Sequence, residues 1–344
     1  MRVLVTGGTG FIGSYAAIAF ADAGHDVRLL VRDPAKAARV FAPHDRPVPE
    51  LVVGDMTDPV AVAAALEGCD AVLHAAAHVG VADGDASAVA TNAVGVRTVI
   101  GAAIERGLDP ILYTSSVTTL YPPTGPVLTP DSPLAEPTGP YSESKVESER
   151  WVHQRQAEGA PITTFVLGGV VGPHQPTVDS AMKGIVAAAT QVMVIPPGGV
   201  GVLDVRDVAT MLTAAMEPGH GPRRYLAGGP FLEWGPWTDA LSDVLGRRVK
   251  RVPTPAVTLK AFGRLLDALK RIKTFDYPMT YEAALAMTSA VPTDDSATLA
   301  ELGITFRPPA DALRDASAWL LSIGELDPSH APKLPNPKRS GADG

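Results

Sequence analysis

Three glycines near the start of the chain have a spacing that could hold a phosphate group. Gly7, Gly10 and Gly13 follow an apolar run, in the order Gly-x-x-Gly-x-x-Gly, and precede a stretch typical of a helix. The first two allow a tight turn that brings the backbone close to a pyrophosphate, and Gly13 lets the helix pack tightly on the strand. The helix N-terminus would present free N–H groups to the phosphates. Strand, glycine turn and helix in this order predict a dinucleotide-binding loop.

A second pair of residues, Tyr141 and Lys145, lies at the start of another predicted helix. Residues four apart project from one face of a helix, so a phenol and an ammonium group would lie side by side. Such pairs also occur on ordinary surface helices. The chemistry of this pair therefore depends on what else the fold brings beside it.

The elements that must position these residues alternate along the chain. Short apolar runs predict strands, the segments between them predict helices, and 121–140 is a proline-rich loop. The predicted strands are 2–6, 26–31, 50–53, 71–77, 111–116 and 162–171, and the predicted helices are 14–23, 59–66, 88–106 and a helix from 141. Strands that alternate with helices in this way predict an α/β fold with a doubly wound parallel sheet, the Rossmann arrangement.

Arg32, directly after the second predicted strand, bears on the choice of cofactor. Dinucleotide-binding folds usually place an acidic residue there for the ribose of NAD, whereas an arginine accommodates the 2′-phosphate of NADP. Asp33 follows at once, but the arginine favours NADP, with NAD as the second choice. At the next strand end, Asp55 offers an acceptor to an adenine amino group. After the fourth strand, the alanines at 75–77 would let a flat cofactor lie against the backbone.

Composition and charge exclude several classes of protein. The formal net charge of −8 argues against a nucleic-acid surface. The single cysteine, Cys69, cannot form an internal disulfide, which fits a reducing cytoplasm. The longest uncharged run, 184–203, contains consecutive prolines that would break a spanning helix, so we expect no transmembrane segment. His74 and His78 would suit a metal only on a helix, and this stretch is typical of a strand, so we expect no metal site.

Together these motifs resemble the extended branch of the short-chain dehydrogenase/reductase superfamily, the NAD-dependent epimerase/dehydratase superfamily. The resemblance covers roughly residues 1–230. It rests on Thr6, Gly7, Gly10, Gly13, Asp55, His74, the alanines 75–77, Asn92, Ser115, Ser116, Tyr141 and Lys145. The run 31–34 is most similar to the dihydroflavonol-reductase and cinnamoyl-CoA-reductase subgroup, which uses NADPH, followed by the 3β-hydroxysteroid dehydrogenase group. One departure is Leu167, where the family usually has a proline.

The resemblance implies a Rossmann domain followed by a smaller C-terminal α/β substrate lobe. We expect residues 1–175 to form the NAD(P)-binding core, with 202–228 partly returning to it. Residues 176–326 would then form most of the substrate lobe. Residues 327–344 are rich in Pro, Lys, Ser and Gly and predict a flexible tail.

The resemblance also implies roles for individual residues. Tyr141 would donate a proton and, in reverse, act as the base, helped by the charge of Lys145, because an ordinary tyrosine titrates near pH ~10. Lys145 would also hold the nicotinamide ribose, Ser116 the substrate oxygen, and Asn92 a proton-relay water. The residues expected to contact the cofactor are Gly7, Thr9, Gly10, Phe11, Ile12, Gly13, Arg32, Asp55, Met56, Ala75, Ala76, Ala77, Tyr141, Lys145 and Val170. The residues on or near loops that could face the substrate are His78, Tyr121, His174, Trp234 and Trp237.

The predicted function is NADPH-linked reduction of a ketone or aldehyde on a hydrophobic substrate, or the reverse alcohol oxidation. The high apolar content favours such a small-molecule substrate. A sugar-nucleotide epimerase or dehydratase with bound NAD is one alternative. An NADP-sensing regulatory protein without turnover is another, although such proteins commonly lack the Tyr-x-x-x-Lys pair. We expect a monomer or a homodimer.

Residues 258–272 predict an amphipathic helix with basic residues on its polar face. The apolar side chains on one face are Leu259, Phe262, Leu265, Leu266, Leu269 and Ile272. A basic amphipathic helix can lie on a membrane surface or bind a partner. More often such a helix covers a core or a pocket, and we expect that role here.

Overall fold

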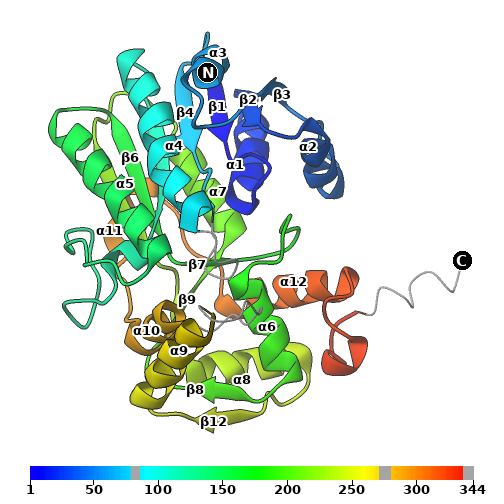
Figure 1. Ribbon diagram of the computed structural model, residues 1–344. Helices are drawn as coiled ribbons and strands as arrows, with labels where there is room; N and C mark the ends of the chain where they lie inside the picture. The colour runs from blue at the N-terminus through cyan, green and yellow to red at the C-terminus, as the bar shows by residue number, and fades with distance from the viewer. Residues whose placement is uncertain (79–85, 271–279, 336–344) are drawn as a thin grey trace, which may run out of the picture.

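A computed structural model describes residues 1–78, 86–270 and 280–335 of the chain. Its centre is a parallel sheet of seven strands in the order β10-β6-β5-β4-β1-β2-β3 (Figure 1). The strands are β1 (Arg2–Thr6), β2 (Asp26–Val31), β3 (Glu50–Val53), β4 (Ala71–His74), β5 (Ile111–Ser116), β6 (Ile162–Leu167) and β10 (Arg223–Ala227). The predicted doubly wound α/β fold is confirmed. In such sheets, ligands bind beyond the carboxyl ends of the strands where the order reverses, here between β1 and β4.

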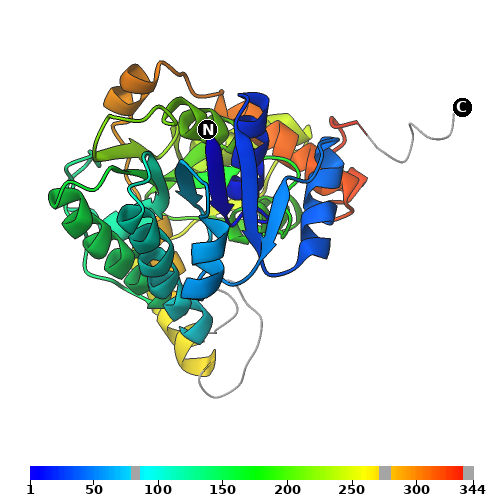
Figure 2. The same cartoon turned by 90° about the horizontal axis from the view of Figure 1, so that it is seen from above.

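Apolar side chains on both faces of this sheet bury two layers of helices. In β1, Val3 and Val5 join one core and Leu4 joins the other, because successive side chains alternate across a strand. The helices on the first face are α1 (Phe11–Asp22), α2 (Pro34–Phe41) and α7 (Val205–Ala214), and those on the second are α3 (Pro59–Ala65), α4 (Ala86–Glu105) and α5 (Pro140–Ala157). Figure 2 shows the sheet between them from above.

A second lobe lies below the sheet in the view of Figure 1. It contains the sheet of β7 (Gly169–Val171), β9 (Gly199–Asp204) and β11 (Phe231–Glu233), and the pair β8 (Met193–Ile195) and β12 (Arg251–Pro253). The remaining helices are α6 (Ser180–Thr190), α8 (Trp234–Leu245), α9 (Ala256–Lys270), α10 (Tyr281–Ser289), α11 (Ser296–Leu302) and α12 (Pro309–Ser322). Short 3₁₀ helices are η1 (Ala42–His44), η2 (Val117–Leu120) and η3 (Pro328–His330). None of the helices in the described ranges is long and apolar enough to cross a bilayer.

The predicted strand 162–171 is broken in the structure at Gly168. A Cβ at this position would collide with the carbonyl of Gly228, so only glycine fits where the two backbones pass each other. Before the break, β6 belongs to the large sheet, and after it β7 pairs with β9 in the second lobe. The glycine therefore marks the point where the chain passes from one sheet to the other.

The predicted flexible tail is wrong for its first part. Ala331 and Leu334 are buried in the core of the second lobe. Between them, the backbone N–H of Lys333 donates to the carbonyl of Leu245 at 3.2 Å. The prediction rested on the polar composition of the whole tail and overlooked these two apolar side chains, which pack in the core and hold the segment near α8. Residues 336–344 lie outside the described residues.

Candidate functional site

The glycine loop between β1 and α1 leaves a helix N-terminus open for a ligand. Gly7 has a φ of +77°, and a Cβ on it would lie 2.6 Å from the carbonyl carbon of Ala75. A Cβ on Gly13 would collide with the carbonyl oxygen of Gly7, so this glycine allows α1 to approach the loop. Gly10 caps α1 without a side-chain hydrogen bond, and its first turn contains no acid. Free N–H groups and an unopposed helix dipole fit a pyrophosphate.

Arg32 and Asp33, which follow β2, are the two candidates for binding the adenosine ribose of the cofactor, and they differ in their contacts. One carboxylate oxygen of Asp33 accepts from the N–H of Ala35 at 2.9 Å and thereby caps α2. The neighbouring Arg32 side chain is 65% exposed, and its guanidinium lies 3.8 Å from a carboxylate oxygen of Asp55. Asp33 therefore stabilises a helix that the sequence analysis did not predict, while Arg32 remains accessible at the strand end.

Asp55 is held in place by its own loop. One of its carboxylate oxygens accepts from the N–H and the hydroxyl of Thr57, at 2.9 and 2.7 Å. Burial acts to raise the pKa of Asp55, but these hydrogen bonds and the charge of Arg32 outweigh it and leave the pKa below its usual value. The side chain of the next residue, Met56, packs against Gly95 of α4.

Asn92 of α4 holds the segment that follows β4. Its amide oxygen accepts from the N–H of His78 at 2.7 Å, and its amide nitrogen donates to the carbonyl of His78 at 3.1 Å. The same nitrogen lies 3.3 Å from the hydroxyl of Ser144 on α5. These bonds occupy the two N–H groups of the amide and hold His78, which directly follows the alanines 75–77. The predicted support of a relay water by Asn92 stays a prediction.

Ser116 of β5 and Tyr141 of α5 are brought close enough for their side chains to interact. Burial raises the pKa of Tyr141 to about 12, and the Ser116 hydroxyl only partly opposes this. The phenol is therefore protonated at neutral pH. Lys145 is itself buried, which lowers its pKa to about 8, and its ammonium lies 3.4 Å from the carbonyl of Thr114.

One turn after Lys145, Glu149 forms a buried network that the sequence analysis missed. Its carboxylate accepts from the guanidinium of Arg224 on β10, at 2.9 and 3.1 Å, and from the hydroxyl of Ser115 on β5. Burial acts to raise the pKa of Glu149, but the His153 ring, 3.5 Å away, and the charge and hydrogen bonds of Arg224 leave the pKa lowered. The network therefore places a negative charge behind Lys145 and fixes α5 to two strands. The four-residue spacing of Lys145 and Glu149 was the available signal.

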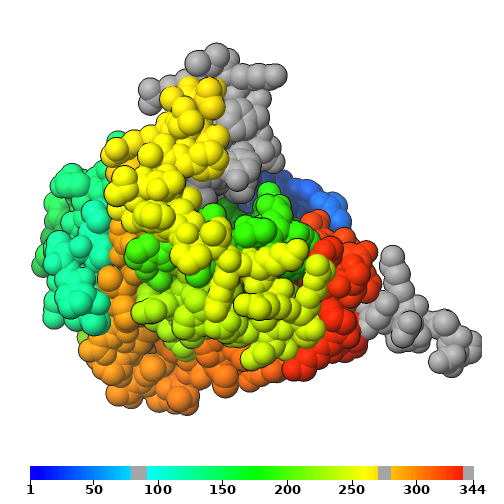
Figure 3. All heavy atoms as spheres, turned by 90° about the horizontal axis from the view of Figure 1, so that it is seen from below, coloured from blue at the N-terminus to red at the C-terminus, as the bar shows by residue number. Residues whose placement is uncertain are grey.

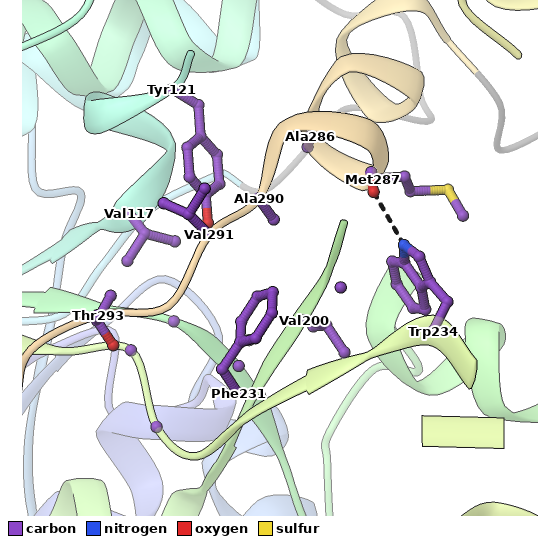
Figure 4. Close-up of a pocket in the computed structure, with 16 residues that line it drawn as sticks. Val117, Tyr121, Val200, Phe231, Trp234, Ala286, Met287, Ala290, Val291 and Thr293 are labelled. Atoms are coloured by element: carbon purple, nitrogen blue, oxygen red, sulfur yellow. Dashed lines mark hydrogen bonds between the residues drawn. The ribbon is translucent and has the colours of Figure 1, made fainter. Parts of the chain in front are cut away.

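An apolar cavity of about 200 Å³ is lined by residues of both lobes, including Val117, the residue directly after Ser116 (Figure 4). Val117 and Tyr121 of the first lobe form one wall. Opposite them, Trp234 donates from its indole nitrogen to the carbonyl of Met287 at 2.9 Å. The lining residues are Val117, Tyr121, Gly168, Gly169, Gly199, Val200, Gly201, Gly228, Gly229, Phe231, Trp234, Ala286, Met287, Ala290, Val291 and Thr293.

Only some of the predicted substrate residues lie at this cavity. Tyr121 and Trp234 line it. His174 instead packs against His44, with ring centres 5.0 Å apart, and Trp237 is buried in the core of the second lobe. His78 is held by Asn92 and does not line the cavity. A role of His78, His174 and Trp237 in facing the substrate stays a prediction, because loop position alone does not fix where a side chain points.

The other predicted cofactor residues surround the glycine loop. Phe11 at the start of α1 packs edge-on against Tyr15, with ring centres 5.8 Å apart. Ile12 and Val170 pack against the core beneath the loop. Thr9 lies within the loop and is partly buried. The cofactor residues predicted from the sequence thus gather at the carboxyl ends of neighbouring strands.

Comparisons with known proteins agree with this architecture. Residues 3–228 match the model of the NAD dependent epimerase/dehydratase family. The chain is 28% identical over 339 residues to sterol demethylase protein B of Methylococcus capsulatus, which covers 95% of this chain and 100% of that protein. It is 32% identical over 171 residues to a 2-alkyl-3-oxoalkanoate reductase of Stenotrophomonas maltophilia, covering 48% and 49% of the two chains.

Solved structures show the same fold over almost the whole chain. The crystal structure of gox2253 has a TM-score of 0.79 and 28% identity, and it covers 95% of this chain and 99% of that one. A UDP-glucose 4-epimerase from Bifidobacterium longum, in complex with NAD⁺ and UDP, has a TM-score of 0.72 at 18% identity, with coverage of 94% and 99%. The match to the family model, over more than half of the residues, shows that this chain belongs to the NAD-dependent epimerase/dehydratase family.

Proposed function

We propose that this chain is an NADPH-dependent reductase of an apolar ketone or aldehyde, which also catalyses the reverse alcohol oxidation. The observation that carries the proposal is an apolar cavity whose lining includes Val117, the residue directly after Ser116 of the Ser116–Tyr141 pair. A carbonyl group near the two hydroxyls would therefore have its hydrocarbon part against Val117, Phe231 and Trp234.

The protonation states of the free protein suit reduction. Tyr141 carries its proton at neutral pH and can give it to a carbonyl oxygen, while the hydroxyl of Ser116 orients that oxygen. Lys145 is positively charged below its pKa of about 8 and would bind the ribose hydroxyls of the nicotinamide nucleotide. Reduced nicotinamide, when bound, supplies the hydride for the carbonyl carbon. A transferred hydride and one proton together convert the carbonyl to an alcohol.

Arg32 supports NADPH as the preferred cofactor, with NADH as the second choice. It lies at the strand end where the adenosine ribose would bind. Its exposed ion pair with Asp55 is weak, so the guanidinium could bind a phosphate in place of Asp55. Asp33, the acid that would favour NADH, is occupied by the start of α2. The guanidinium is therefore the group better placed to select a nucleotide.

Calorimetric titration with NADPH and NADH, together with turnover of a panel of apolar carbonyl compounds, tests the proposal. Arg32→Ala should remove the preference for NADPH, and the exposed Arg46→Ala, on another part of the surface, is its control. Tyr141→Phe should abolish turnover while NADPH still binds, and Tyr281→Phe, whose hydroxyl lies outside the cavity beside Arg264, should keep turnover. Normal turnover by the Tyr141 variant would exclude the mechanism.

Two other functions make different predictions in the same experiments. A sugar-nucleotide epimerase would retain NAD through purification and bind UDP-sugars, whose charged and hydroxylated groups match poorly with the apolar lining residues. A regulatory protein would bind NADPH without oxidising it with any carbonyl compound. The interaction of Ser116 with Tyr141 and the buried Lys145 weigh against the second alternative.

A further inference from the structure

Part of the apolar surface of α9 faces solvent. Leu259 and Leu266 are buried, and Gly263 between them allows close packing on α10, since a Cβ there would lie 2.7 Å from the carbonyl of Thr280. Leu265 and Leu269, however, are 55% and 43% exposed. Val257 and Phe262 are exposed as well. The prediction that this helix covers a core therefore accounts for only one side of its apolar surface, and Ile272 lies outside the described residues.

The exposed side of α9 contains no charged residue over a broad arc. Helical residues are spaced by about 100°, so Val257 to Leu269 on this side span about 140° of the helix surface. The residues in the arc are Val257, Thr258, Ala261, Phe262, Leu265, Ala268 and Leu269. Arg264 borders one edge of the arc, and Lys260 lies about 40° beyond Arg264. The acid of α9, Asp267, lies about 20° beyond Lys260, away from the arc, and accepts from the N–H of Tyr281 at 2.8 Å.

Basic residues gather on the same part of the molecule. Arg247, Arg248, Lys250 and Arg251 are exposed and directly precede α9. Residues 247–270 contain seven Lys and Arg and one Asp, a formal charge of +6 in a chain whose net charge is −8. Figure 3 shows α9 beside the segment of α8 and β12 on the face seen from below. In the described part of the chain, Arg251 has an ion pair with Asp239 at 2.8 Å, whereas no ion pair involves Arg248 or Lys250.

We propose that this face, formed by α9 and residues 247–251, docks on an anionic membrane surface. An apolar helix face bordered by Lys and Arg matches both parts of such a surface, the acyl boundary and the negative headgroups. A second copy of the chain is a poorer occupant, because a two-fold interface would place the +6 segment against itself. The docking surface is thus complementary to anionic lipid in charge and in apolar character.

The proposed docking helix lies close to the candidate substrate cavity. The buried side of α9 packs on α10, and Ala286 and Met287 of α10 line the cavity. One helix therefore separates the proposed membrane face from the cavity wall. If the cavity binds an apolar substrate, as proposed above, this arrangement places the cavity near the lipid bilayer, in which such a substrate dissolves. Docking itself does not depend on that function.

Vesicle flotation of the full chain tests the proposal. One set of vesicles contains equal parts of phosphatidylcholine and phosphatidylglycerol, and the other contains phosphatidylcholine alone. We expect binding to the anionic vesicles only, and weaker binding as salt is raised, because salt screens exposed charges. Replacing both Leu265 and Leu269 with Ser should weaken binding at least about tenfold. Replacing both Arg248 and Lys250 with Gln should weaken it roughly twenty-five-fold, about fivefold for each charge.

Matched variants on other faces serve as controls. Val60→Ser removes an apolar side chain that is 77% exposed on α3, and Arg46→Gln removes an exposed charge near α1. Both should bind vesicles as the parent does, and circular dichroism checks that every variant is folded. Equal binding to the two kinds of vesicle, or no binding to either, would overturn the proposal. So would sedimentation showing a dimer that dissociates in the Leu265/Leu269 variant while vesicles are not bound.

Discussion

Lys145 and Glu149 are buried, opposite charges on one face of α5. Burial lowers the pKa of Lys145 to about 8, and Glu149 raises it. Arg224 forms an ion pair with Glu149 at 2.9 Å, which compensates the buried carboxylate that stabilises the ammonium form of Lys145. At the scale of single residues, the charge of Lys145 therefore depends on a side chain that does not reach Ser116 or Tyr141.

Glu149→Gln should move the alkaline limit of activity to lower pH. The ammonium form of Lys145 exists below its pKa, so the rate of NADPH-linked reduction should fall as pH rises through about 8 in the parent. Without the charge of Glu149, that pKa falls and the decline begins earlier. The measurement is kcat/KM for NADPH against pH. Glu147→Gln, an exposed acid on the same helix, is the control. An unchanged alkaline limit in a folded Glu149 variant would contradict the prediction that Glu149 controls the pKa of Lys145.

Asn92→Ala should separate a positioning role from a role in proton relay. The variant leaves the N–H and the carbonyl of His78 without their partner, which costs about 1–3 kcal/mol of stability for an unsatisfied buried group. If Asn92 positions the segment after β4, KM for the nucleotide rises and kcat changes little. A fall in kcat alone would instead support a relay water. Thr98→Ala, on the exposed side of the same helix, controls for a general effect on α4.

At the scale of elements, the large sheet could be predicted from short apolar runs in the sequence. The features that depend on contacts between distant segments could not. Most strands of the first lobe are buried apolar runs, so the sequence predicts their positions directly. The exception is β10, which begins with Arg223 and Arg224 and is not among the predicted strands. The glycine turn and the Tyr141–Lys145 pair are local patterns, and their residues indeed gather at the strand ends.

The cavity and the basic face could not be predicted in the same way. The cavity combines Val117, Val200, Phe231 and Met287, which lie on four separate elements. Their meeting depends on how glycine-rich strand ends pack, which no local pattern encodes. The net charge of −8 is a sum over the whole chain, so it gives no sign of the positive segment 247–270.

Gly201→Ala tests the packing of these strand ends. A Cβ at Gly201 would collide with the carbonyl of Gly228, a backbone atom that cannot move aside freely. We expect a loss of about 1–3 kcal/mol of unfolding free energy. Gly184→Ala is the matched control, because Gly184 lies within α6 and a Cβ there meets nothing within 4 Å. The control should be neutral or stabilising by up to ~1 kcal/mol, since alanine favours a helix. Chemical denaturation of both variants decides the comparison.

At the scale of the whole molecule, the proposed function divides binding between the two lobes. The candidate nucleotide residues belong to the first lobe, except Val170 of β7. The far wall of the cavity comes from the second lobe, where Trp234 is bonded to Met287. Substrate affinity and nucleotide affinity should therefore respond to different variants, although the chemistry needs both lobes.

Trp234→Ala should raise KM for an apolar carbonyl substrate by about tenfold, equivalent to ~1.4 kcal/mol of lost binding. The dissociation constant of NADPH, measured by calorimetry, should stay unchanged, because Trp234 is in the second lobe. Trp319→Ala is the matched control: Trp319 packs in the same lobe core but does not line the cavity. Both variants should lose stability, but only the first should lose substrate affinity. An unchanged KM in the Trp234 variant would show that substrate binds elsewhere. Equal losses of substrate and NADPH affinity would show instead that the two lobes bind as one unit.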